Sequence, residues 1–425
     1  MNNQRLELVA DFYEYTMANG YFNKNMEDRI AYFDVFFRKV PDEGGYAIVA
    51  GLEQIINYIR NLSFDEEDIS YLRKQNKFSE EFLNYLENFR FTGDIWAIPE
   101  GTVVFPNEPL ITVKAPIIQA QLLETMLLLT TNHQSLIATK TSRIVRAAQG
   151  RPVMEFGARR AHGINAAVEG ARAAIIGGAV GTSCTLSAKE FNVPASGTMA
   201  HSWIQSFDSE YEAFKAYAEL YPDDCTFLID TYNTIESGLP NAIKVFNEVL
   251  KPKGYRPKAV RLDSGDLAYL SKKVRKILDE AGYEDCKICA TNSLDEYLIK
   301  SLIEQDAKID LFGVGENLIT AKSEPVFGGV YKLVALEKDK KIVPKIKVSE
   351  NTAKVTNPSF KKVYRFYDNE TKKAIADVIT LADEIIDERE YMIFDPQNPW
   401  KKKVLKDYSI RLLQEKIFEE RKINI

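Results

Sequence analysis

Histidine and cysteine are both scarce in this sequence: its 425 residues include three histidines and four cysteines. Four scattered cysteines do not make the dense disulfide framework of a small secreted domain, so the sequence favours a reducing compartment. Three histidines leave few candidates for acid–base or nucleophilic chemistry. No stretch reaches the roughly 18 uninterrupted apolar residues of a membrane helix. The most apolar segment, 115–131, is interrupted by glutamine and glutamate and predicts a buried helix.

Positive charge is not in excess either. The formal net charge is −6, and a mild acidic balance argues against a dedicated nucleic-acid binder. The opening residues, MNNQRLELVADFYEYTM, lack a basic leader followed by an apolar core, so no secretory signal is predicted. We therefore expect a cytoplasmic protein with neither a membrane nor a nucleic acid as a partner.

With 45% apolar and 27% charged residues, the chain has the composition of a globular protein. The pattern of apolar and polar residues along the sequence divides it into three regions. Residues 1–130 mix helical and strand-forming segments and predict an N-terminal α/β domain. In 131–340, short β-rich runs alternate with amphipathic helical segments, which predicts parallel strands with crossover helices. Residues 341–425 predict an α/β or mainly β segment that packs back on the body.

The predicted strands of the middle region are RPVMEF, ASGTMA, CTFLID, AVRLD, KICAT, DLFGVG and GVYKLV. Six or seven such units favour a barrel over a doubly wound sheet. Nearly every run ends near a polar residue or a glycine, namely Arg159, His201, Asp230, Asp263, Asn292 and Gly315. Because the carboxyl ends of parallel strands feed the loops on one face, we expect these residues to gather in one site.

Two features of the middle region point to an anionic ligand. Residues 140–172 contain seven basic residues against two acidic ones, and Arg159 and Arg160 follow a predicted strand and a glycine. The planar guanidinium matches carboxylates and phosphates. Glycine-bearing turns recur at GGAVGTS, SGTMAHS, DSGD, FGVGE and FGGV. Their backbone N–H groups can approach a phosphate closely, although none has the spacing of a known nucleotide-binding loop.

Carboxylates and histidines supply the remaining candidates. Asp230, Asp263 and Asp266 could bind ribose hydroxyls or magnesium, while Asp263 or Ser264 could alternatively cap the helix that starts near residue 267. His133 lies in a helical pattern and is predicted to be structural. His162 is a weaker functional candidate, because two arginines precede it. His201 follows a predicted strand and precedes a helix, where a nucleophile or an acid–base group could act.

The CxxC match at Cys286 and Cys289 lies in a strand-like run without a second pair. Alternation along a strand places the two sulfurs on opposite faces, so we predict ordinary packing rather than metal or redox chemistry.

Taken together, these motifs resemble the nicotinate phosphoribosyltransferase family over nearly the whole chain. The resemblance rests on DFYEYTMANGYF, FFRKVPDEGGYAIVAGLE, EFGARRAHG, GTSCTLSAKEF, SGTMAHSW, IDTYNT, VRLDSGDL, FGVGENLIT and GGVYKLV, in that order. It implies that nicotinate and phosphoribosyl pyrophosphate react to nicotinate mononucleotide and pyrophosphate, coupled to ATP hydrolysis. It also implies a homodimer with shared active sites. The fold it implies is an irregular (β/α) barrel of the type II phosphoribosyltransferase kind, with an N-terminal α/β domain completed by the C-terminal segment.

The resemblance also assigns roles to individual residues. Tyr13 is expected to stack on the pyridine ring across the dimer, Thr198 to lie beside nicotinate, and Arg159 and Arg261 to meet its carboxylate or nearby phosphates. His201 matches the histidine that ATP phosphorylates, which makes His201, Arg159, Arg261 and Asp263 the catalytic candidates. Those for phosphoribosyl pyrophosphate are Asp230, Asp263, Ser264, Gly265, Asn292, Gly313, Gly315, Glu316, Gly328 and Gly329. ATP and Mg²⁺ are the implied cofactors, with Asp263 and Asp266 as candidate magnesium ligands.

Two positions depart from the family pattern, and three alternatives stay open. Cys184 stands where asparagine is usual, and Glu316 stands where threonine is common, near the expected phosphates. The first alternative is a related phosphoribosyltransferase using nicotinamide or quinolinate, and the second is a catalytically silent nucleotide-binding paralogue. The third is another barrel enzyme acting on a phosphorylated sugar, which would want a lysine at a strand end; Lys322 and Lys332 are poor candidates for it.

Overall fold

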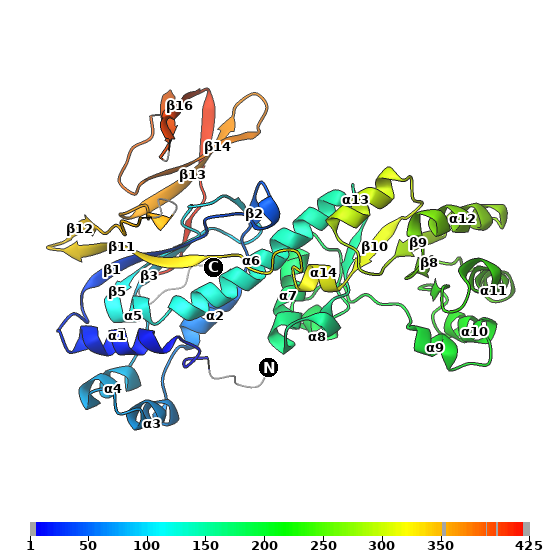
Figure 1. Cartoon of the computed structure of the whole chain (residues 1–425), viewed down its shortest axis with the longest axis horizontal. Helices are drawn as coiled ribbons and strands as arrows, with labels where there is room; N and C mark the ends of the chain where they lie inside the picture. Colours follow the sequence, from blue (N-terminus) through cyan, green and yellow to red (C-terminus); the bar gives the residue numbers. More distant parts are fainter. Residues whose placement is uncertain (1–5, 351–353, 388, 397, 420–425) are drawn as a thin grey trace. The chain divides into compact units, whose positions relative to one another are not determined.

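The computed structural model describes residues 6–350, 354–387, 389–396 and 398–419 (Figure 1). Residues 1–5, which open the segment predicted to lack a secretory signal, lie outside this part. The chain forms two compact units, Met1–Ser135 with Val326–Ile425, and Leu136–Pro325. The C-terminal segment therefore shares a unit with the N-terminal residues. The domain boundaries predicted near 130 and 340 stay a prediction, because a compact unit is not by itself an independently folding domain.

The first unit is built on a six-stranded sheet in the order β12-β11-β1-β5-β3-β18. Its strands are β1 (Ile30–Phe36), β3 (Asp94–Ala97), β5 (Ile111–Pro116), β11 (Val330–Lys338), β12 (Lys341–Pro344) and β18 (Glu415–Phe418). All of its neighbours are antiparallel. The helices of this unit are α1 (Phe12–Phe22), α2 (Leu52–Asn61), α3 (Glu66–Lys74), α4 (Glu80–Glu87) and α5 (Ile117–Gln121).

The run GVYKLV was predicted to be the last parallel strand of the middle region, and that prediction was wrong. It lies in β11, which pairs antiparallel with β1. The ring of Tyr331 stacks on that of Phe33 at a centroid distance of 4.7 Å, and Tyr331 is 1% exposed. Strand-forming residues specify an extended backbone but not its neighbour, and here burial against the aromatic side chains of β1 selects the partner.

The rest of the C-terminal segment forms smaller antiparallel sheets. One contains β13 (Lys361–Asp368), β14 (Ala374–Leu381) and β17 (Tyr408–Leu412), and a hairpin joins β15 (Glu390–Asp395) to β16 (Asn398–Lys406). A further two-stranded sheet pairs β2 (Ala47–Ile48) with β4 (Val103–Val104). Lys401, Lys402 and Lys403 are exposed on β16.

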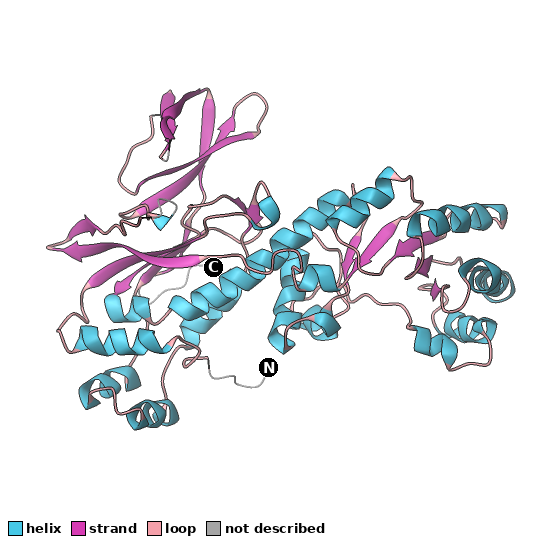
Figure 2. Cartoon of the chain, in the orientation of Figure 1, coloured by secondary structure: helices cyan, strands magenta, loops and turns pink. Residues whose placement is uncertain are grey.

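The second unit contains a parallel five-stranded sheet in the order β6-β10-β9-β8-β7, with helices beside it (Figure 2). The strands are β6 (Val153–Glu155), β7 (Thr226–Leu228), β8 (Ala259–Leu262), β9 (Lys287–Ala290) and β10 (Leu311–Val314). Single parallel bridges extend it from Glu155 to Thr182 and from Thr182 to Ala195. The parallel sheet expected from the alternating pattern is confirmed.

The helices of this unit are α7 (Ile164–Ile176), α8 (Thr185–Glu190), α9 (His201–Gln205), α10 (Glu210–Leu220), α11 (Leu239–Val245), α12 (Leu267–Glu280), α13 (Glu296–Glu304) and α14 (Glu316–Ile319). The long helix α6 (Glu124–Ala147) contains the boundary between the units, and it includes His133 as the sequence predicts. No helix among the described residues is long and apolar enough to cross a membrane.

The segment ASGTMA was predicted to be a strand, but only Ala195 forms a bridge and 196–200 is irregular. Gly197 lowers the strand propensity there, and the segment supplies polar groups to the site instead. Aromatic packing fixes the neighbouring β7, because Phe227 stacks between Phe214 of α10 and Phe246 at centroid distances of 4.5 and 5.4 Å. Each fully buried ring contributes roughly 2–3 kcal/mol, so β7 is firmly held.

Cys286 and Cys289 are both free and buried, as the predicted packing role requires. Burial raises the pKa of each thiol to about 12. A thiol that stays protonated near neutral pH is a poor nucleophile and a poor metal ligand.

Candidate active site

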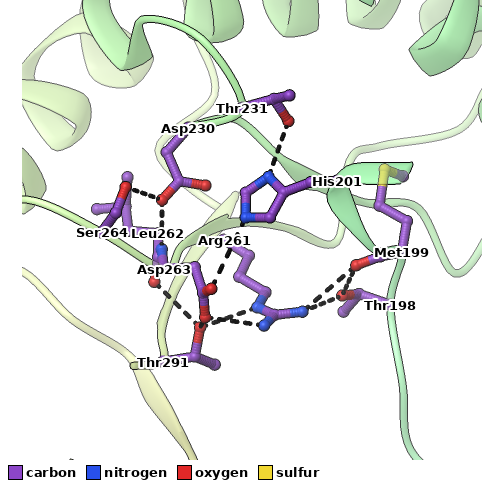
Figure 3. Close-up of polar contacts among 10 residues, drawn as sticks. All are labelled: Thr198, Met199, His201, Asp230, Thr231, Arg261, Leu262, Asp263, Ser264 and Thr291. Carbon is purple, nitrogen blue, oxygen red and sulfur yellow. Dashed lines mark hydrogen bonds and ion pairs between the residues drawn. The ribbon is translucent and has the colours of Figure 1, made fainter. Parts of the chain in front are cut away.

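Arg261 on β8 lies at the centre of a polar network in the second unit (Figure 3). Its Nε donates to Thr291 Oγ1, its Nη1 to Thr198 Oγ1, and its Nη2 to Asp263 Oδ1, each at 3.0 Å. Nη1 also lies 3.4 Å from the carbonyl oxygen of Met199. The guanidinium is thereby held in one orientation, with only part of its donor capacity left for a ligand.

Asp263 connects this arginine to the histidine. It directly follows β8, and its Oδ1 also accepts a hydrogen bond from Thr291 Oγ1. His201, the first residue of α9, places its Nε2 at 3.7 Å from Asp263 Oδ2 and its Nδ1 at 3.1 Å from Thr231 Oγ1. Both ring nitrogens therefore face polar partners, and such partners determine which nitrogen carries the proton.

Asp230 follows β7 and supports the loop after β8. Its Oδ2 accepts hydrogen bonds from the backbone N–H of Asp263 at 2.8 Å and from Ser264 Oγ at 2.6 Å. Its Oδ1 is buried without a hydrogen-bond partner, although the residue is 9% exposed. A buried, unsatisfied carboxylate oxygen is costly, so a ribose hydroxyl or a cation at this oxygen would be stabilising.

Magnesium prefers oxygen ligands, and two carboxylate residues meet here, because the backbone N–H of Asp263 donates to the side chain of Asp230. The described residues contain no cluster of three or more His, Cys, Asp and Glu side chains arranged for a metal. Asp266, the other predicted ligand, caps α12 by accepting from the N–H of Tyr269 at 3.0 Å. The helix is thus capped by Asp266 and not by Asp263 or Ser264, because only Asp266 directly precedes the first turn.

Arg159 lies in a helical turn, Ala158–Arg160, after β6. Its side chain is exposed and, among the described residues, makes no hydrogen bond or ion pair. Arg160 Nε is 4.0 Å from Glu316 Oε2, and Lys322 Nζ is 3.3 Å from Glu316 Oε1. Two cations therefore flank the carboxylate that departs from the family pattern, which reduces its repulsion of a phosphate.

Several predicted glycine and loop positions lie at the same strand ends. Gly265 (φ 77°) and Asn292 (φ 86°) follow β8 and β9 in left-handed conformations. A Cβ at Gly313 would lie 2.6 Å from Phe156 Cδ2, so the backbone of β10 needs glycine there. Gly315 directly precedes α14. That these four residues bind phosphoribosyl pyrophosphate stays a prediction.

Three predicted residues belong to the first unit. Tyr13 lies on α1 with 44% of its surface exposed, and burial of its hydroxyl together with nearby Glu124 raises its pKa. Gly328 has φ 72°, and the N–H of Gly329 donates to Asn132 Oδ1 at 2.8 Å. Their roles in binding nicotinate and phosphoribosyl pyrophosphate also stay predictions.

Sequence reasoning missed Thr231 and Thr291, which bind the ring of His201 and the guanidinium of Arg261. Both follow predicted strands, in IDTY and KICAT, so the rule that selected Asp230 and Asn292 could have found them. It also missed Glu155 and Thr182, which are wholly buried. His162 lies exposed before α7, outside the network in Figure 3.

A parallel α/β sheet with an arginine and two carboxylates at its strand ends, and a histidine in contact with one of them, defines an enzyme-type site for a polar, anionic ligand. Comparison with known proteins gives the family. Models of the nicotinate phosphoribosyltransferase (NAPRTase) family match residues 152–380, with its N-terminal domain at 8–132 and its C-terminal domain at 360–424. The chain belongs to the nicotinate phosphoribosyltransferase family and is an enzyme of this type.

Individual relatives agree with this membership. The chain is 46% identical over 416 residues to nicotinate phosphoribosyltransferase of Bacillus subtilis (strain 168), covering 98% of this chain and 84% of the relative. The Caenorhabditis elegans enzyme is 36% identical over 436 residues, covering 89% and 76%. The crystal structure of human nicotinic acid phosphoribosyltransferase superposes with a TM-score of 0.85 at 26% identity, covering 97% and 90%. A nicotinate-nucleotide pyrophosphorylase from Pyrococcus furiosus (TM-score 0.76, 24% identity, covering 100% and 92%) shares the fold.

Proposed function

We propose that this chain transfers the phosphoribosyl group of phosphoribosyl pyrophosphate to nicotinate, giving nicotinate mononucleotide and pyrophosphate, the first step of NAD salvage from nicotinate. The observation that carries the proposal is the match over 98% of the chain to an enzyme with that name. The polar network around Arg261 supports it, because the network offers a cation for an anionic substrate and carboxylates for ribose hydroxyls.

The reaction asks mainly for positioning and charge stabilisation. The ring nitrogen of nicotinate is already nucleophilic, so no strong general base is needed at the reacting carbon. Breaking the bond to pyrophosphate leaves positive charge on the sugar and negative charge on the leaving group. Arg159 and Arg261 would orient nicotinate or stabilise phosphate oxygens, and Asp230 would hold a ribose hydroxyl through its unsatisfied Oδ1. Magnesium, for which Asp263 and Asp266 are the candidate ligands, would neutralise charge on the pyrophosphate.

Coupling to ATP is the second part of the proposal, and it concerns His201. With a proton on Nε2 facing Asp263, the lone pair lies on Nδ1, where the hydroxyl of Thr231 is its partner. Nδ1 would attack the terminal phosphorus of ATP, ADP would leave, and the Nε2 proton would stay beside Asp263. The phosphorylated ring would add negative charge beside the loops after β7 and β8, which could reorder them.

The architecture and assembly complete the proposal. The strand order β7-β8-β9-β10-β6, extended by Thr182 and Ala195, follows the cyclic order of the sequence. We propose an irregular barrel whose seam lies between Ala195 and β7, where no β-bridge joins the described residues. We further propose a cytoplasmic homodimer in which Tyr13 of one subunit completes the site of the other.

A product assay with nicotinate and phosphoribosyl pyrophosphate, with and without ATP, tests this function. We expect nicotinate mononucleotide in both reactions and faster formation with ATP. Nicotinamide, which lacks a carboxylate for an arginine, serves as the comparison substrate. Turnover of nicotinamide without turnover of nicotinate would overturn the substrate assignment, and no turnover of either, with intact nucleotide binding, would favour the silent paralogue.

A further inference from the structure

Glu155 is a wholly buried carboxyl group that the proposed reaction does not use. It is the last residue of β6, and it is 0% exposed. One carboxyl oxygen, Oε1, accepts a hydrogen bond from the backbone N–H of Gly157. The other, Oε2, accepts from Thr182 Oγ1 at 2.6 Å. Among the described residues no cation pairs with it, so these two donors are what offset its burial.

Thr182 extends this contact into the next loop. The threonine is also wholly buried, and its Oγ1 accepts from the backbone N–H of Cys184 at 2.9 Å. The hydroxyl proton is therefore directed at Glu155, since the N–H of Cys184 takes the acceptor side of the oxygen. Glu155 and Thr182 thus link the turn after β6 to the loop that begins α8. We call these two side chains the Glu155–Thr182 pair.

The turn that Glu155 holds is the one that carries Arg159. The turn is closely packed, because a Cβ at Gly157 would lie 2.6 Å from Ile319 Cγ2 and 2.8 Å from Glu155 Oε1. The N–H of Arg160 then donates to the carbonyl of Gly157 at 2.7 Å. Arg159 has no side-chain partner of its own among the described residues, whereas three side chains hold Arg261. The position of the Arg159 guanidinium therefore depends on its backbone turn.

We propose that the Glu155–Thr182 pair positions Arg159 for substrate, so that Glu155 and Thr182 are positioning residues of the reaction. This inference rests on the proposed function. If the pair is broken, the turn loses its anchor at Gly157, and Arg159 meets its anionic partner from a shifted backbone. A shift of about 1 Å at a binding group can lower kcat/KM by up to 10²-fold, so a measurable effect is expected without any loss of an atom that touches substrate.

The central test replaces Thr182 by valine, which keeps the shape of the side chain and removes the hydroxyl. We expect the KM of the substrate that Arg159 contacts to rise about tenfold, and the KM of the other substrate to stay within about twofold. Arg159→Ala identifies that substrate independently, because it should raise the same KM. Thr182→Ser keeps the hydroxyl and should restore the wild-type KM. Thr141→Val is the matched control, since Thr141 is buried and, in the described part of the chain, its hydroxyl bonds only to the carbonyl of Ile137 in its own helix.

A double-mutant cycle separates positioning from a merely structural role. In an Arg159→Ala background, Thr182→Val should add less than about a twofold further loss in kcat/KM, because the arginine it positions is gone. Full additivity of the two losses would overturn the proposal, as would a lower Tm for Thr182→Val with unchanged KM values.

Two measurements keep the test decisive. If Thr182→Val does not fold, Glu155→Gln replaces it, because glutamine keeps the volume and can accept only one of the two hydrogen bonds. Its KM for the Arg159 substrate should rise, and an unchanged value would contradict the proposal. If the wild-type chain makes no nicotinate mononucleotide, the proposed function fails. Calorimetric binding of nicotinate and of phosphoribosyl pyrophosphate to the same variants then shows whether Thr182→Val and Arg159→Ala weaken the same ligand, and different ligands would overturn the positioning role.

Discussion

Arg261 uses most of its hydrogen-bonding capacity on the protein itself. Its contacts with Thr198, Thr291 and Asp263 come from three different segments of the chain, each at 3.0 Å. Such a guanidinium is preorganised, so it can meet a carboxylate or a phosphate without paying for its own ordering. Lysine has no planar fork and cannot make these contacts together.

We therefore expect Arg261→Lys to raise the KM of nicotinate by about tenfold or more, the effect of losing one charge-assisted hydrogen bond. Steady-state kinetics with varied nicotinate measure this change. Arg256→Lys is the matched control, because Arg256 is exposed before β8 and pairs with Asp285 away from the network. An unchanged nicotinate KM in Arg261→Lys would remove this arginine from the nicotinate site.

His201 differs from Arg261 in that its role is chemical rather than positional in the proposed mechanism. His201→Ala is expected to abolish the stimulation by ATP while weak ATP-independent transfer persists, because the phosphorylated nitrogen is lost. The measurement is the ratio of initial rates with and without ATP. His162→Ala, at an exposed histidine, should keep the full ratio. Undiminished stimulation in His201→Ala would contradict the phosphohistidine.

At the scale of elements, the end of β7 depends on a glycine that follows it. Gly238 closes a π-helical turn, Thr234–Gly238, and a Cβ there would overlap the carbonyl oxygen of Ile229. Ile229 directly precedes Asp230, whose carboxylate supports the loop after β8. The close contact between Gly238 and the backbone of Ile229 therefore helps to fix the position of Asp230. Turns of the π-helical type occur often at functional sites.

Gly238→Ala is expected to lower the free energy of unfolding by about 2–3 kcal/mol, because the backbone must shift to admit the methyl group. It should also lower kcat/KM, since Asp230 moves with Ile229. Thermal unfolding and kinetics on the folded fraction measure the two effects. Gly20→Ala in α1, where a Cβ would meet nothing within 4 Å, should be neutral or stabilising. Equal stability of Gly238→Ala and wild type would show that the turn is not tightly packed.

At the scale of the whole molecule, buried carboxyl groups link stability to pH. Burial raises the pKa of Glu14 to about 7, although hydrogen bonds from Thr125 and the N–H of Asp11 act in the opposite direction. Burial and a hydrogen bond with Asp377 likewise raise the pKa of Glu108. Because the folded chain holds these protons more tightly than the unfolded chain, stability falls as pH rises from about 4.5 to 7 through the Glu14 transition.

Glu14→Gln should weaken this dependence. Its amide oxygen can keep the contacts of Oε1 and it carries no charge, so we expect a gain of roughly 1 kcal/mol at pH 8 and little change at pH 5. Urea unfolding at both pH values measures the difference. Glu81→Gln, on the exposed face of α4, controls for the loss of one surface charge. Equal effects of the Glu14 variant at pH 5 and pH 8 would show that Glu14 does not titrate in this range.

The sequence by itself determined the local elements and the chemistry of the strand ends. Alternating apolar and amphipathic segments gave the parallel strands of the second unit, because period and propensity are local properties. The rule that strand ends carry functional groups found Asp230 and Asp263 after strands that the structure contains, and His201 after a segment that is irregular in the structure. All three lie in one network. Family motifs then supplied the reaction.

Only the tertiary structure decided which segments pair and how side chains are held. The partner of β11 depends on burial against β1, and the capping role of Asp266 depends on where α12 begins. The contacts of Thr291 with Arg261 join residues 30 positions apart. The Glu155–Thr182 pair joins residues 27 positions apart. These contacts form when separate strands come together in the fold. The pattern of residues along the sequence does not give the distance in space between residues on different strands.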